Sequence, residues 1–149
     1  STLISSTFWT ERIGSAAALA TLDVMEKEKS WKIIPEIGKQ IKKNWIKLAS
    51  ENSLNINILG LDALPKIYFN SKKNKNVEYK TYISEEMLNH GILASNAIYV
   101  CTKHDKKILD KYYNILNEIF KMIKKCEDEK ESINHLLKTP VCISNIRDS

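Results

Sequence analysis

Three adjacent hydroxyl residues near the start of the sequence carry the strongest chemical signal in the chain. Ser5, Ser6 and Thr7 stand shortly before an alanine-rich run at 16–20, whose composition favours a helix. Hydroxyl groups and the unpaired amides at a helix start both donate hydrogen bonds to anions, and the helix dipole favours negative charge there. The cluster is therefore a candidate phosphate site. A simple helix cap would use the same residue types, so both interpretations fit.

The residues around this cluster also match a known pattern. Residues 6–8 read Ser-Thr-Phe, and residues 16–22 read Ala-Ala-Ala-Leu-Ala-Thr-Leu. This arrangement resembles the fold type I, class III aminotransferases that depend on pyridoxal phosphate, a family that includes glutamate-1-semialdehyde aminomutase. Family members have Ser/Gly-Thr-Phe/Leu-x-Gly-Asn-Pro and then Ala-Ala-x-Leu-Ala-x-Leu at the same offsets. The resemblance implies that Thr7, with Ser6 beside it, binds the cofactor phosphate of the other subunit across a dimer interface.

The chain departs from the family immediately after this match. Thr10, Glu11 and Arg12 stand where the family has Gly-Asn-Pro, so a charged pair replaces a neutral turn. One interpretation is a solvated turn or a local ion pair. The other is a subgroup with a polar, unusual substrate, in which Glu11 and Arg12 lie at the substrate entrance.

A second stretch that resembles the family lies downstream. Residues 87–95 read Met-Leu-Asn-His-Gly-Ile-Leu-Ala-Ser, similar to the family's helix end Met-Leu-x-x-Gly-(Val/Ile)-x-(Leu/Phe)-x-(Pro/Ser). Residues 99–108 then resemble the strand and the helix that follow it in the family. The resemblance covers most of residues 3–125 and places Ser95 and Asn96 at the substrate entrance.

The resemblance implies a domain plan. Residues 1–14 form a phosphate-contact segment joined to a large domain upstream, residues 15–125 the C-terminal small domain, and residues 126–149 a charged extension. The family's Schiff-base lysine and the residues that hold the cofactor ring lie upstream, so no catalytic residue is assigned here. Because the sequence begins with Ser1 and not with methionine, we expect a segment of a longer, homodimeric enzyme that is inactive alone.

Periodicity predicts an α+β fold with a small three-stranded, mainly antiparallel sheet covered by long helices. Apolar residues at three- and four-residue steps indicate helices, and alternation indicates strands. Pro35 is placed in the first turn of the second helix, Gly91 after the third helix, and Thr102 with Asp105 in a capping box before the last. The expected helices begin at Gly14, near Pro35, near Tyr79 and near Ile108, and the expected strands span 55–60, 64–70 and 97–102.

Composition excludes several classes. No apolar stretch is long enough to cross a membrane and no signal peptide opens the chain, so a cytoplasmic location is expected. The net charge is +5, but 21 of the 23 basic residues are lysines spread along the chain, which disfavours nucleic-acid binding. Three cysteines and three histidines lack the spacing of metal ligands, so no metal site is expected and the thiols are expected to be reduced.

The function implied by the resemblance is the movement of an amino group between small-molecule donor and acceptor, or within one substrate. The tail at 136–142, Leu-Leu-Lys-Thr-Pro-Val-Cys, is similar to that of class III enzymes acting on cell-surface sugars or nonulosonates, which favours a polar carbonyl substrate. Two alternatives stay open: an autonomous α+β interaction or regulatory domain without catalysis, and a lysine-rich nucleic-acid binder.

Overall fold

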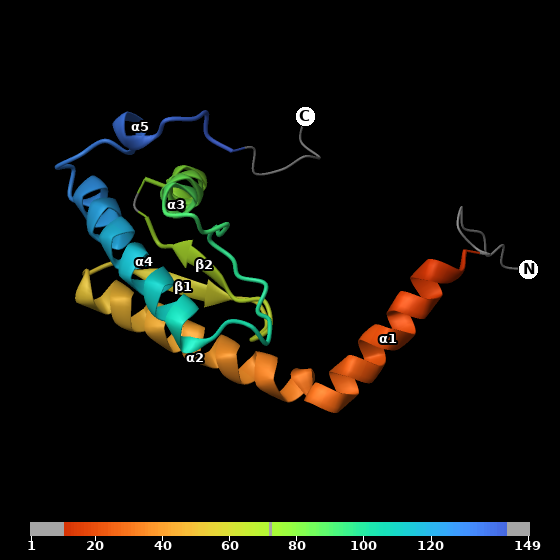
Figure 1. Cartoon of the computed structure of the whole chain (residues 1–149). Helices are drawn as coiled ribbons and strands as arrows, with labels where there is room; N and C mark the ends of the chain where they lie inside the picture. Colours follow the sequence, from red (N-terminus) through yellow and green to blue (C-terminus); the bar gives the residue numbers. More distant parts are fainter. Residues whose placement is uncertain (1–10, 72, 143–149) are drawn as a thin grey trace, which may run out of the picture.

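The computed structural model describes residues 11–71 and 73–142. Ser5, Ser6 and Thr7 therefore lie outside the described residues. The helices are α1 (Arg12–Glu28), α2 (Ser30–Glu51), α3 (Asn76–Asn89), α4 (Lys106–Glu127) and α5 (Ile133–Leu136), and the strands are β1 (Ile56–Leu59) and β2 (Lys66–Phe69). Figure 1 shows a packed body from α2 onward, with α1 extending away from it.

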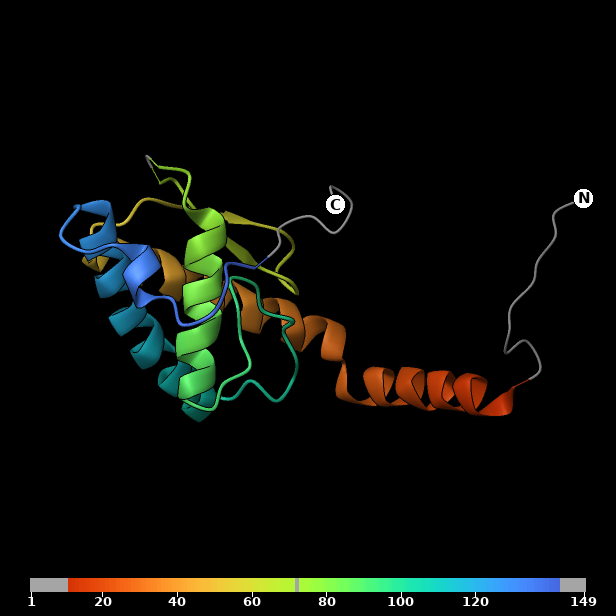
Figure 2. The same ribbon diagram turned by 90° about the horizontal axis from the view of Figure 1, so that it is seen from above.

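The first two helices are separated by a single left-handed residue. Lys29 has φ 52° and ψ 42°, which ends α1 and lets α2 begin at the next residue. Every residue of α1 is exposed, and Figure 2 shows the helix projecting from the body. Since α2 begins at Ser30, Pro35 lies in its second turn, and the predicted first-turn position is wrong. A proline there leaves the carbonyl of Trp31 without its helical donor.

The sheet has two strands within the described residues. β1 pairs with β2 in antiparallel register, with Ile58 opposite Ile67, as the short connection predicted. The third strand expected at 97–102 is wrong: only one bridge forms, between Lys66 and Ala97. The segment still follows the edge of β2, because the amide of Ile98 donates to the carbonyl of Pro65 at 3.1 Å. Pro65 has no amide hydrogen to return that bond, so a regular ladder cannot form.

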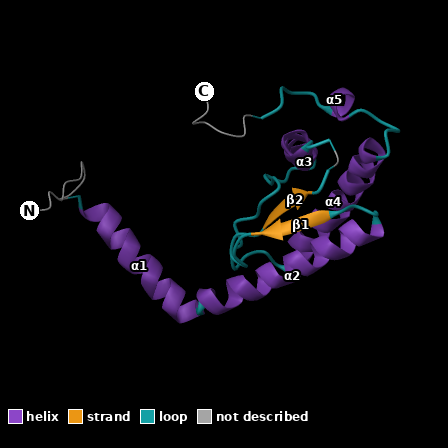
Figure 3. Cartoon of the chain, turned by 180° about the vertical axis from the view of Figure 1, so that it is seen from behind, coloured by secondary structure: helices purple, strands orange, loops and turns teal. Residues whose placement is uncertain are grey.

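The core lies between the sheet and three helices, which surround the strands in Figure 3. The stripe predicted on α2 is confirmed at Ile41 and Trp45, both of which are fully buried. Phe69 of β2 contacts the rings of Tyr79 and Phe120 edge to face, with centroids 5.4 and 5.8 Å apart. These aromatic contacts join β2 to α3 and to α4.

The helix ends partly follow the sequence expectation. Gly91 follows the end of α3 with φ 73°, as predicted. Tyr79, Ile83 and Met87 are buried on one face of that helix, whereas His90 is exposed at its end. The N-cap of α4 is Asp105, whose side chain accepts from the amide of Ile108 at 2.8 Å, so the capping box that starts at Thr102 is wrong.

The packed body continues past residue 125. Cys126 and Ile133 are buried in the same apolar cluster as the rest of the core. The boundary placed between residues 125 and 126 stays a prediction. After α5 the chain runs back across α3 as far as residue 142, as Figure 2 shows.

Candidate functional site

Glu11 caps the start of α1. Its carboxylate accepts hydrogen bonds from the amides of Ile13 at 2.7 Å and Gly14 at 2.9 Å. The bond from Gly14, followed by that from Ile13, lowers the pKa of Glu11 below its usual value. Glu11 is thus the N-cap of α1, and Arg12 is the first residue of the helix. This geometry supports the turn interpretation of the charged pair; the substrate-entrance assignment stays a prediction.

The cap changes what the start of α1 can bind. An anion site at a helix start needs free amides and a positive local field. Two first-turn amides already donate to Glu11, and its negative charge opposes a phosphate at that position. The described start of α1 therefore does not fit a phosphate group. The assignment of Thr7 and Ser6 concerns residues outside the described ranges and stays a prediction.

Replacing Glu11 by alanine is expected to fray the first turn of α1, because two amides lose their acceptor. Hydrogen exchange at Ile13 and Gly14 should become faster, while α4, capped by Asp105, should not change. In the wild type, the cap should be present at neutral pH and lost as the pH falls through the lowered pKa of Glu11. Exchange rates that do not change in Glu11→Ala would show that the cap is dispensable.

Asn96 acts on β2. Its carbonyl accepts from the amide of Ile67 at 2.7 Å, and its side-chain amide donates to the carbonyl of Ile67 at 3.0 Å. Asn96 and Ile67 are both buried, and Asn96 alone satisfies the backbone amide and the backbone carbonyl of Ile67. This positions the neighbouring Ser95, which is half-buried. The substrate-entrance assignment of both residues stays a prediction.

Ser95 lines an apolar pocket of about 510 Å³ between α3, the segment 92–99 and the first half of α4. No Asp, Glu, Lys or Arg side chain lines it, and Leu93 and Tyr99 are 96% and 81% exposed. A pocket of this kind suits an apolar group held by few polar contacts. The sequence analysis named Ser95 but not the exposed apolar side chains of Leu93 and Tyr99, which follow no periodic pattern.

The predicted site residues do not come together in the described structure. Glu11 and Arg12 lie at the outer end of α1, whereas Ser95 and Asn96 belong to the packed body (Figure 1). A site that uses both pairs of residues therefore needs further polypeptide between them.

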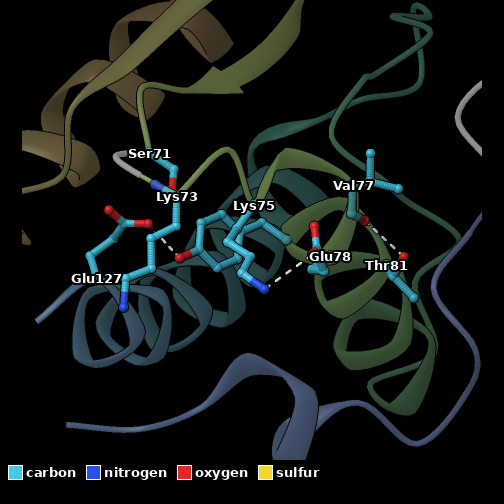
Figure 4. A network of polar contacts seen from close by, with 8 residues as sticks. Ser71, Lys73, Lys75, Val77, Glu78, Thr81 and Glu127 are labelled. Carbon is cyan, nitrogen blue, oxygen red and sulfur yellow. Dashed lines mark hydrogen bonds and ion pairs between the residues drawn. The ribbon is translucent and has the colours of Figure 1, made fainter. Parts of the chain in front are cut away.

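A lysine-lined pocket of about 550 Å³ lies at the start of α3, near the polar network in Figure 4. Each of three lysines there has a carboxylate partner: Lys73–Glu129 at 2.7 Å, Lys75–Glu78 at 3.3 Å and Lys130–Asp128 at 3.6 Å. The phenol of Tyr79 donates to Glu127, and burial, then Glu127, raises the pKa of Tyr79. Because the lysine charges are paired, this pocket is a poor phosphate site.

Residues 11–71 and 73–142 offer neither a metal-binding cluster nor a membrane-spanning helix. No group of three or more His, Cys, Asp or Glu side chains in these ranges is arranged to hold a metal ion. Cys101, Cys126 and Cys142 are free thiols. Within the same ranges, no helix combines the length and the apolar character needed to cross a membrane.

Comparison with known proteins identifies the fold. No family model and no curated protein matches the sequence. Among solved structures, the PLP internal aldimine form of the FumI protein from Sphingopyxis sp. MTA144 superposes with a TM-score of 0.73. Sequence identity is 13%, and the match covers 91% of this chain and 33% of the FumI chain. The chain therefore has the fold of part of a PLP-dependent protein and spans about a third of its length.

Proposed function

We propose that the chain is the C-terminal part of a class III, pyridoxal-phosphate-dependent aminotransferase or aminomutase. The observation that carries the proposal is the structural match to FumI, a PLP-bound protein, over 91% of this chain. The sequence motifs at 6–8, 16–22 and 87–95 support the same family. The enzyme would move an amino group onto or within a polar carbonyl substrate, in the cytoplasm.

The exposure of α1 supports the proposal that more polypeptide packs on it. The helix has 17 residues, none of them buried, and Leu19 and Leu22 are 65% and 60% exposed. In proteins, most of the stability of a helix comes from tertiary packing of one of its faces. A large domain and a second subunit, as in the family, would cover it.

The chain's own share of the proposed activity is binding and positioning. The hydroxyl of Thr7, with Ser6 beside it, would donate to the cofactor phosphate, and Glu11 would fix the direction in which the chain enters α1. When bound, the cofactor supplies the electron sink for the chemistry. Secure phosphate binding matters because a misplaced reactive ring can cost about a hundredfold in rate. The pocket at Ser95 is mainly apolar and has no Asp, Glu, Lys or Arg in its lining, which gives no support to a strongly charged substrate group there.

In the full polypeptide, Thr7→Ala is expected to weaken cofactor binding about tenfold or more, as for loss of a hydrogen bond to a charged group. Thr7→Ser keeps the hydroxyl and should retain most of the affinity. Cofactor-free protein is titrated with pyridoxal phosphate, and the visible absorbance is followed. Thr21→Ala, which removes a hydroxyl that donates to the carbonyl of Ala17 within α1, is the matched control. Equal affinities for Thr7→Ala and wild type would remove Thr7 from the site.

The second candidate, an autonomous interaction domain, is favoured by the chain's own buried core. The coding sequence distinguishes the two candidates. The aminotransferase proposal requires that the coding sequence continue upstream of Ser1 into a domain with a Schiff-base lysine. The 149-residue chain alone should develop no visible cofactor absorbance. A stable band would show that the chain holds a reactive lysine of its own.

A further inference from the structure

The segment 138–142 is held across α3 by side chains of that helix. The amides of Lys138 and Thr139 donate to the carboxylate of Glu85 at 3.1 and 2.8 Å, and the Thr139 hydroxyl donates to the same group. One turn earlier, the Thr81 hydroxyl accepts from the amide of Cys142 at 3.0 Å. Glu85 and Thr81 are four residues apart and therefore lie on one face of α3.

Glu85 is the main attachment of this segment. It accepts three of the hydrogen bonds that fix the segment, and bonds to a charged acceptor are about twice as strong as neutral ones. Pro140 has no amide hydrogen to add a further bond. The nearby pair of Lys138 and Glu86 is 4.0 Å long with an exposed lysine, and such pairs contribute little.

The far end of the segment carries a partly shielded thiol. The sulfur of Cys142 lies 3.8 Å from the carbonyl of Val77, and the residue is half-buried. Cys101 is exposed and Cys126 is buried. Since thiol reactivity depends on exposure, the three cysteines should react at three different rates.

We propose that residues 138–142 form a latch that is closed by Glu85 and that shields the Cys142 thiol until it opens. Opening breaks the bonds to Glu85 and frees the amide of Cys142 from Thr81, so the thiol becomes accessible to electrophiles and oxidants. The latch does not need pyridoxal phosphate, because it is formed by hydrogen bonds between α3 and residues 138–142.

The electrostatics of Glu85 set the direction of a pH response. Burial raises the pKa of Glu85, but the bonds from Thr139 and Lys138 and the charge of Lys138 outweigh it, so the pKa lies below its usual value. Glu86 and Tyr82 of α3 and Lys138 of the latch are the titratable groups around it. The latch should therefore be closed at neutral pH and should open as the pH falls through this lowered pKa.

The test measures the alkylation rate of each cysteine with iodoacetamide, by mass spectrometry of peptides. In this reaction the thiolate forms an S–C bond, iodide leaves, and the thiol proton goes to solvent. In Glu85→Ala, Cys142 should react about tenfold faster or more, as expected for loss of bonds to a charged acceptor. Cys101 should keep its rate, and Cys126 should stay protected. Glu86→Gln, which weakens the long pair with Lys138 and the bond from the Asn89 side chain but leaves Glu85 in place, should leave all three rates unchanged.

A second variant leaves α3 intact. Thr139→Pro removes the amide and hydroxyl donors from the latch side and should give the same selective increase at Cys142. If Glu85→Ala also exposes Cys126, the chain has unfolded, and Thr139→Pro decides the result. The latch is overturned if Cys142 keeps its rate in Thr139→Pro, or if it reacts as fast as Cys101 in the wild type.

Discussion

Replacing Gly38 by alanine is expected to lower the free energy of unfolding by about 3 kcal/mol or more, at the upper end of overpacking costs. Gly38 is buried in the middle of α2. A Cβ atom built there lies 1.7 Å from the carbonyl oxygen of Asp62 and 2.6 Å from its carbon. Both atoms belong to backbone, so no side-chain rotation can relieve the clash.

The turn that Gly38 approaches is also fixed from a second side. Lys42, one helical turn after Gly38, forms an ion pair with Asp62 at 2.8 Å and donates to the carbonyl of Gly60 at 3.0 Å. Gly60 itself has φ 84°, a conformation that side chains disfavour. Moving this turn to admit a methyl group would break these contacts and shift the strand pair away from α2.

A matched control exists in α1. Gly14→Ala places its Cβ 3.6 Å from the nearest atom, a carboxylate oxygen of Glu11, which is an ordinary contact. Helix propensity alone should then favour alanine by up to about 1 kcal/mol. Urea denaturation of both variants, with circular dichroism for α1, checks the opposite signs. A loss of less than about 1 kcal/mol in Gly38→Ala would mean that the turn adapts.

Local patterns predicted what depends on local chemistry. The stripe through Ile41 and Trp45, the antiparallel strand pair and the left-handed Gly91 all follow from periodicity and turn chemistry. The missing third strand follows from Pro65, a residue visible in the sequence whose effect depends on which segment pairs with it. Periodicity finds a strand's apolar face but not its partner.

Contacts between distant residues could not be predicted in this way. The close approach of Gly38 to Asp62 and the bonds from Thr139 to Glu85 join segments far apart in the chain. Glu11 shows a subtler case: from the sequence, both a turn and a place at the substrate entrance fitted its charge, and the structure shows its carboxylate capping α1. Residue type alone could not separate a charge that binds a ligand from one that binds a backbone amide.

The second large effect is expected at Trp45, where truncation to alanine should cost about 3 to 5 kcal/mol. The side chain is fully buried, and its indole nitrogen donates to the hydroxyl of Tyr112 at 3.0 Å. This bond joins α2 to α4 inside the core. Burial raises the pKa of Tyr112, so the phenol stays protonated and keeps its place in the pair at alkaline pH.

A double-mutant cycle separates the hydrogen bond from the packing. Tyr112→Phe should cost about 1 to 3 kcal/mol, because it leaves the indole N–H of Trp45 buried without an acceptor. Trp45→Phe removes that donor, so the double variant should be less destabilised than the sum of the single variants. Tyr112 also borders the pocket that contains Ser95. If the two single losses simply add, the hydrogen bond contributes nothing to stability, and the cost of each truncation comes from lost packing in the core.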